Sequence, residues 1–170
     1  MVLKIIKYPD AILRKKAVPI DKISEEIFKL ADDMVETMLK EDGLGLAANQ
    51  VGSRLRIFVI NTTPHEDKPT PVVMINPEIL SQEGSVNTEE GCLSFPELYI
   101  SIVRPEKVRM HAKDLYGEDS VYEMDGVLAR AVLHEIDHLN GTLIIDYVDA
   151  SEQDKVRKYV DGLQCKTTDT

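Results

Sequence analysis

The chain has 170 residues, of which 43% are hydrophobic and 29% are charged, with 9 glycines and 8 prolines. This length and composition exclude a collagen-like, low-complexity or disordered chain and predict one soluble globular domain. The 20 basic residues are outnumbered by 30 acidic ones, so the formal net charge is −10. Nucleic-acid binding needs clustered basic residues, and the sequence has no such cluster, so we expect no nucleic-acid partner.

No apolar run approaches the roughly 20 residues that a membrane-spanning helix needs, so we expect no membrane association. The apolar patch near the first residue is too short for a signal peptide, which favours a cytoplasmic location. The two cysteines are Cys92 and Cys165. A cytosolic domain of this size does not need a disulfide, so each cysteine is considered alone, and Cys165 in its polar surroundings is interpreted as inert.

Hydrophobic periodicity predicts the elements of the first part of the chain. Apolar residues at helical spacing predict a helix from about Ser24 to Lys40, which the Asp42-Gly43 pair ends. The polar, proline-containing stretch from Asn61 to Thr70 is predicted to be a loop. Short apolar or alternating runs predict several strands, at 56–60, 72–75, 108–112 and around 121.

The last third of the chain is predicted to be mostly helical. A second helix is predicted after Gly126, from Val127 to Leu139, and stops at Asn140-Gly141, and a weaker one is expected from about Ser151 to Gln164. Residues 1–165 are expected to form one domain, with 166–170 as a frayed tail. The turn-rich spacing of the strands favours antiparallel pairing. We therefore expect an α+β fold, with mainly antiparallel sheets around the second helix and further helices toward both ends.

The second helix contains the sequence His134-Glu135-Ile136-Asp137-His138. Residues four apart lie on one helix face, so both imidazoles can bind one metal ion, while Glu135 can reach a water on that ion without coordinating it. The alternative is a helix with two ordinary surface histidines. The apolar residues that flank them place the histidines near a core, which makes this alternative weaker.

A catalytic metal site needs three protein ligands and one open position, so the two histidines lack a partner. Beyond His138 the chain offers carboxylates but no histidine. We favour Cys92, because Gly91 and the polar residues Glu90 and Ser94 make its surroundings a shaped turn. The alternative is an inert buried thiol, which is the commonest state of a free cysteine.

A third unusual segment runs from Gly43 to Gln50. It lacks the lysine and hydroxyl residue of a phosphate-binding loop. Its glycines permit a ligand to approach the backbone closely, and the Gln50 amide could donate a hydrogen bond to developing negative charge. A turn between two helices with an exposed Gln50 explains the segment equally well.

Together, these three segments resemble the signature motifs of the peptide deformylases. These metal hydrolases remove the formyl group from N-formylmethionine on nascent chains. The matching stretches are 43–50, 90–94 and 134–138, in the family's order, and the resemblance extends from Tyr8 to about residue 160.

The resemblance implies that Cys92, His134 and His138 bind one divalent transition-metal ion per chain, natively Fe(II), for which zinc, nickel or cobalt can substitute. Glu135 would take a proton from the water on that ion and later give one to the leaving amine. The Gln50 side chain and the Leu93 backbone N–H would stabilise negative charge on the formyl oxygen.

The resemblance also implies how the substrate lies. The peptide would pair in extended form with segments around Gly45 and Gly91. An apolar pocket would accept the methionine side chain, and its walls would be Leu44, Val127, Ala131 and the face of His134. Arg130 is a charged residue beside this pocket. Either its stem lines the pocket while its head reaches solvent, or it alters the substrate preference.

Charged residues outside the ligand set have expected supporting roles. Glu90 and Arg104 are expected to pair, either fixing the turn that holds Cys92 or forming a charge pair at the rim. Asp137 faces the wrong side of the helix for a ligand and is expected to orient its neighbours. Two histidines are interpreted as non-ligands, namely His65 and His111.

Three hypotheses of function remain. The first is a formyl-peptide hydrolase that acts on nascent formyl-Met polypeptides, with the ribosome as a candidate partner. The second is a zinc peptidase of the HExxH type, which needs a downstream carboxylate ligand and leaves Cys92 dispensable. The third is a domain that a metal only stabilises, in which a protein group closes the fourth position and Glu135 has no task.

Overall fold

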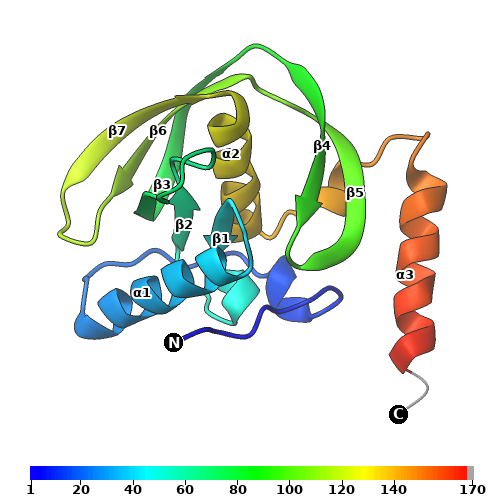
Figure 1. The fold of residues 1–170 in the computed structure, drawn as a ribbon, viewed down its shortest axis with the longest axis horizontal. Helices are drawn as coiled ribbons and strands as arrows, with labels where there is room; N and C mark the ends of the chain where they lie inside the picture. The colour runs from blue at the N-terminus through cyan, green and yellow to red at the C-terminus, as the bar shows by residue number, and fades with distance from the viewer. Residues whose placement is uncertain (168–170) are drawn as a thin grey trace.

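A computed structural model describes residues 1–167, which form an α+β fold with two antiparallel sheets (Figure 1). The helices are α1 (Glu25–Lys40), α2 (Gly126–Asn140) and α3 (Gln153–Thr167). The larger sheet has the order β1-β2-β3-β6-β7, and its strands are Gly45–Ala47, Ile57–Asn61, Pro71–Glu83, Lys107–Lys113 and Asp119–Asp125. The smaller sheet pairs β4 (Val86–Cys92) with β5 (Phe95–Arg104). The predicted fold class is confirmed.

Strand β2 shows how the larger sheet is buried on both faces. Phe58 and Ile60 belong to the core on the α2 side, whereas Ile57 and Val59 belong to the core on the α1 side. Successive side chains of a strand point to opposite faces, so this apolar run supplies two cores at once. The two helices therefore cover opposite faces of the sheet.

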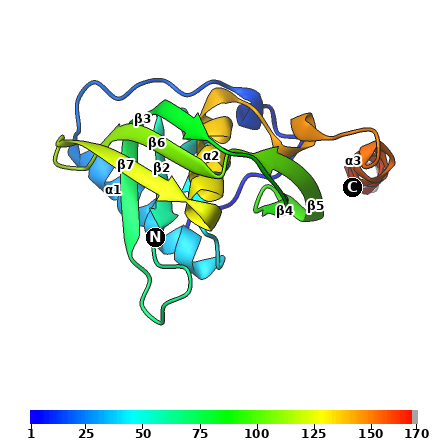
Figure 2. The ribbon, with the colours of Figure 1, turned by 90° about the horizontal axis from the view of Figure 1, so that it is seen from above.

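Helix α2 lies between the larger sheet and the β4–β5 pair (Figure 2). It ends at Gly141, whose φ of 77° is the left-handed conformation that terminates a helix. A Cβ atom at this position would lie 2.5 Å from the carbonyl oxygen of Arg14, so the close approach also requires glycine. The predicted bounds of this central helix are confirmed to within a residue.

The β4–β5 sheet builds a third core that the sequence analysis missed. Along β5 buried residues mostly alternate with exposed ones, and the buried apolar residues are Phe95, Leu98, Ile100 and Ile102. These side chains pack against Leu13 and against the 3-10 turn η3 (Ile144–Tyr147). The alternation of apolar and polar residues along β5 is a strand signal that could have been read from the sequence. The short strand β1 was also missed.

The C-terminal helix α3 extends along the side of the molecule beyond β5 (Figures 1 and 2). It contacts the third core through Val156 and Tyr159. Lys166 and Thr167, which were predicted to fray, continue the helix, and residues 168–170 of the predicted tail lie outside the described residues. Within 1–167, no helix has the length and apolar character that crossing a bilayer requires. The predicted loop between Asn61 and Thr70 joins β2 to β3.

Candidate active site

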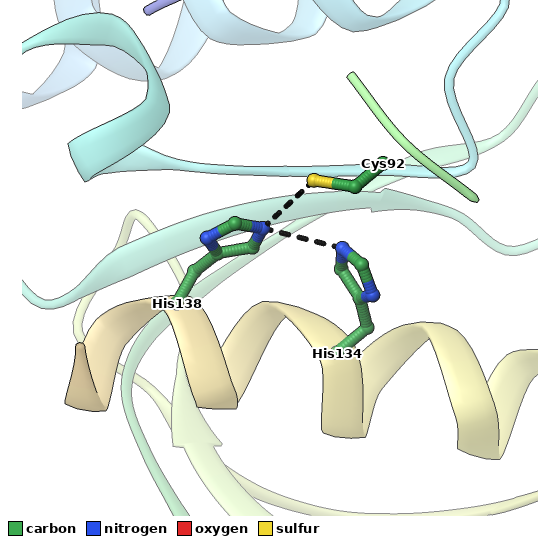
Figure 3. A group of neighbouring side chains, drawn as sticks. All are labelled: Cys92, His134 and His138. Atoms are coloured by element: carbon green, nitrogen blue, oxygen red, sulfur yellow. Dashed lines mark hydrogen bonds between the residues drawn. The ribbon is translucent and has the colours of Figure 1, made fainter. Parts of the chain in front are cut away.

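The three predicted metal ligands converge between β4 and α2 (Figure 3). Cys92 is the last residue of β4, and its Sγ lies 3.2 Å from Nε2 of His138. The same nitrogen lies 3.2 Å from Nε2 of His134, one helical turn earlier. Tetrahedral zinc separates two nitrogen ligands by about 3.4 Å and a sulfur from a nitrogen by about 3.6 Å. The donor atoms therefore fit one transition-metal ion.

The opposite nitrogen of His134 is held by Glu90, whose Oε2 lies 3.1 Å from Nδ1. With its proton on Nδ1, the ring presents the lone pair of Nε2 to the cluster. Burial favours the neutral form of Glu90, but hydrogen bonds from His134 and Arg104 outweigh it and lower the pKa of Glu90. Burial also lowers the pKa of His138, and the positive charge of Arg104 adds to that effect. A neutral His138 is suited to metal binding.

Glu90 and Arg104 form a buried bidentate pair. Nε of Arg104 donates to Oε1 of Glu90 at 2.5 Å, and its Nη2 donates to Oε2 at 3.0 Å. Both side chains are 4% exposed, so this is not a pair at the rim. Nη1 of Arg104 donates to Oδ2 of Asp137 at 2.8 Å, which agrees with the orienting role predicted for Asp137. The pair fixes the strand end that carries Cys92.

Glu135 lies beside the ligand cluster on α2. Its side chain is buried, and its Oε2 is sealed from solvent without a hydrogen-bond partner among residues 1–167. Burial raises the pKa of Glu135 to about 7, while the positive charge of Arg104 opposes that rise. A carboxyl group that titrates near neutrality can both accept and return a proton.

Gln50 is 1% exposed, which excludes the alternative of a surface turn with an exposed glutamine. It lies in the 3-10 turn η2 (Ala48–Val51) directly after β1. Its Oε1 accepts a hydrogen bond from the Ala47 backbone N–H at 2.9 Å. Its Nε2 therefore points the other way, toward Sγ of Cys92 at 3.6 Å and Oγ of Ser94 at 3.2 Å. The amide donor is thus aimed at the cluster.

The cluster opens into a cleft of about 590 Å³. Ten of the predicted site residues line it, namely Leu44, Gly45, Gln50, Gly91, Cys92, Leu93, Val127, Ala131, His134 and Glu135. His138 is buried behind them. Leu93 occupies the turn between β4 and β5, where its carbonyl oxygen accepts a hydrogen bond from Nζ of Lys7 at 2.6 Å. The predicted role of its N–H stays a prediction.

Other residues of the cleft were not predicted from the sequence. Lys7 and Tyr99 line it, and the Tyr99 ring lies against Gly91 so closely that a Cβ atom there would be 2.7 Å from Cε1. Four acidic residues also line it, namely Glu41, Asp42, Glu89 and Glu97. Asp42 and Glu89 directly precede two of the motifs, but no pattern in the sequence indicates that these four residues line a cleft. Arg130 lines the cleft too, and its Nε is buried without a partner in residues 1–167.

The two histidines interpreted as non-ligands lie outside the Cys92, His134 and His138 cluster. His111 on β6 pairs with Asp119 on β7 at 2.8 Å. His65 lies in the loop between β2 and β3.

Comparisons with known proteins identify the family. The polypeptide deformylase family model matches residues 2–154. A peptide deformylase of Thermodesulfovibrio yellowstonii is 45% identical over 157 residues, which cover 92% of this chain and 95% of that protein. The crystal structure of a Legionella pneumophila peptide deformylase has a TM-score of 0.88 and 37% identity, covering 100% of this chain and 99% of that one.

A plant structure is equally similar. Arabidopsis thaliana peptide deformylase 1B, solved in complex with an inhibitor, has a TM-score of 0.91 and 37% identity and covers 97% of this chain and 92% of that one. These similarities span nearly the whole chain and include both the sequence and the fold. The chain belongs to the peptide deformylase family of enzymes.

Proposed function

We propose that this enzyme removes the N-formyl group from formylmethionine at the N-terminus of newly synthesised polypeptides. The observation that carries the proposal is the convergence of Cys92, His134 and His138 beside Glu135, whose carboxylate oxygen Oε2 is buried without a hydrogen-bond partner in residues 1–167. The family membership of the chain supports the substrate. Because such substrates are made by ribosomes in the cytoplasm, we place the enzyme there and include the ribosome as a proposed partner.

Cys92, His134 and His138 would bind one divalent transition-metal ion per chain. We propose Fe(II) as the native ion because of the resemblance to the peptide deformylases, and Zn(II), Ni(II) or Co(II) as substitutes because a mixed thiolate and imidazole set accepts all four. When bound, the ion would act as a Lewis acid and lower the pKa of the attacking water.

Glu135 would accept the proton of the attacking water. It would then donate a proton to the amine nitrogen as the bond from that nitrogen to the formyl carbon breaks, so that formate and a free α-amino group leave. Burial supports both roles, because it raises the pKa of Glu135 to about 7. In the interval between these steps Glu135 holds the proton.

Two donors would stabilise the negative charge that develops on the formyl oxygen. One is the Nε2 group of Gln50, whose direction is set by the hydrogen bond from Ala47 to its Oε1. The other is the backbone N–H of Leu93. Donors placed in this way are typically worth about 2.7 to 4 kcal/mol each.

The cleft would hold the peptide in extended form against Gly45 and Gly91. The methionine side chain would lie among Leu44, Val127 and Ala131, which all line the cleft. An apolar wall suits the flexible thioether of methionine, and main-chain pairing accepts many sequences beyond it. The proposed preference is therefore strong for the first residue only.

A zinc peptidase of the HExxH type is the alternative, and substrate discrimination tests it. The metal-loaded enzyme is offered a formyl-Met peptide, its acetyl-Met counterpart and an internally cleavable peptide. We expect release of formate from the first and no hydrolysis of the other two. Cleavage of the internal peptide without formate release would instead identify a peptidase.

A further inference from the structure

A closed circuit of hydrogen bonds ties strand β4 to helix α2. It runs from His134 on α2 to Glu90 on β4, then to Arg104 on β5, and returns to Asp137 on α2. Glu90 lies two residues before Cys92. The circuit therefore controls how the strand that carries the thiol lies relative to the helix that carries the imidazoles.

Arg104 is the centre of this circuit. Its guanidinium is buried and serves both carboxylates, with Nε and Nη2 on Glu90 and Nη1 on Asp137. A planar guanidinium fixes the directions of all its donors at once. Any movement of Asp137 therefore changes the position of the Glu90 carboxylate and, through it, the His134 ring.

Tyr147, the last residue of η3, contacts the circuit at two points. Its hydroxyl group donates to Oδ2 of Asp137 at 2.7 Å, the same oxygen that Arg104 contacts. Its ring lies under the Arg104 guanidinium, 4.9 Å from the ring centroid to Cζ. Asp137 has a 21% exposed side chain, so without Tyr147 it would have greater freedom to turn toward solvent.

We propose that Tyr147 is a positioning residue that sets the geometry of the metal ligands. It acts through Asp137, Arg104 and Glu90 on His134, and it touches neither the metal nor the substrate. The inference rests on the proposed function only in taking His134 and Cys92 as metal ligands. Outer partners of metal ligands typically change metal affinity by about 10 to 100-fold when they are removed.

The test replaces Tyr147 by phenylalanine, which removes the hydroxyl group and keeps the ring under Arg104. Competition with a chelator measures the affinity for Zn(II) and Co(II), and the visible absorption spectrum of the Co(II) form reports the ligand geometry. Because Tyr147 is 38% exposed, water replaces part of the lost contact, and we expect the low end of the range, about a tenfold weaker affinity. The Co(II) bands shift, and kcat falls while KM is retained.

Tyr116→Phe is the matched control, because Tyr116 is 84% exposed and its ring contacts Phe28, which is not part of the circuit. A Tyr147→Phe protein whose Co(II) spectrum and affinity match those of Tyr116→Phe overturns the proposal. The same change in an Asp137→Ala background must have a smaller effect, because the acceptor that links the Tyr147 hydroxyl group to Arg104 is then absent. An effect of unchanged size there also contradicts the proposed route.

The spectrum and the affinity do not depend on the substrate. If the wild-type enzyme binds metal but releases no formate, the proposed function fails while the role of Tyr147 can still be measured. If formate is released and Tyr147→Phe changes neither the spectrum nor the affinity, only this inference fails.

Discussion

Gly45 faces the carboxylate of Glu135 so closely that a Cβ atom at position 45 would lie 2.6 Å from Oε1 and 2.8 Å from Cγ. The backbone of β1 thus forms the wall against which the proposed base lies. A glycine in a strand commonly marks such a close approach. This close approach explains why the Gly43–Gln50 motif has glycine at position 45.

Gly45→Ala is predicted to displace the Glu135 side chain. We expect kcat to fall by at least about tenfold and the free energy of unfolding to fall by about 1 to 3 kcal/mol, because the added methyl group overpacks a filled site. Steady-state kinetics and denaturant unfolding measure the two effects. Gly162→Ala on α3 is the control, since a Cβ atom there meets nothing within 4 Å, and it should leave kcat unchanged.

Cys92→Ala is predicted to abolish stable metal binding, because two imidazoles remain where three donors converge. Metal analysis after gel filtration should find far less than one equivalent, together with loss of formate release. Full metal retention would show that another group, such as a downstream carboxylate, completes the site. The peptidase hypothesis would then regain support.

Tyr147 is predicted to give the folded protein a stability contribution that disappears at alkaline pH. Burial and the hydrogen bond to Asp137 raise the pKa of Tyr147 from 10.0 to about 12, while the charge of Arg104 opposes the shift. The folded state thus holds the phenolic proton more tightly than the unfolded state. The contribution is complete below pH 10.0 and is lost as the pH rises toward about 12.

The difference between wild type and Tyr147→Phe isolates this titration. The difference between the two proteins in the free energy of unfolding should become smaller across that alkaline window. Subtracting the tyrosinate absorbance of the variant from that of the wild type should leave a titration near pH 12, which belongs to Tyr147. A stability difference that is constant up to pH 12 would contradict the contact with Asp137. A Tyr147 hydroxyl group that titrates at its ordinary pKa in the wild type would contradict it too.

Arg130→Met is predicted to stabilise the protein. The Nε of Arg130 is sealed from solvent and has no hydrogen-bond partner in the described part of the chain, and an unsatisfied buried donor costs about 1 to 3 kcal/mol. We expect a gain at the lower end of that range in denaturant unfolding, with activity on formyl-Met peptides retained. Arg109→Met is the control, because the Arg109 side chain is half exposed and pairs with Glu123 at 3.3 Å. A loss of stability in Arg130→Met alone would mean that the guanidinium has a favourable partner.

Local patterns were sufficient for the parts of the fold that depend on periodicity. The apolar spacing of α1 and α2, and the glycine that ends α2, were readable because each signal lies within a few neighbouring residues. The position of His134 and His138 on one helix face follows from the same geometry. The shaped turn around Cys92 favoured it as the third ligand and the motif resemblance implied it, but no local rule could show that the thiol meets His134, which lies 42 residues later.

Long-range contacts could not be read in this way. The sequence left open whether Glu90 and Arg104 pair in the interior or at the rim, because burial depends on how β4 and β5 pack against α2. Tyr147 received no role at all, since nothing near η3 indicates that its hydroxyl group meets Asp137. The acidic residues around the cleft come from separate segments, and only the folded chain brings them together.

The central claim is that Glu135 transfers protons at a site built by Cys92, His134 and His138. Its most direct test is formate release from a formyl-Met peptide by a Glu135→Ala protein that holds a full equivalent of metal. We predict that this variant is folded and metal-bound and that its kcat is at least about a hundredfold below wild type, since general acid–base groups contribute about 10² to 10⁴-fold. Wild-type formate release by the metal-loaded variant would contradict the account.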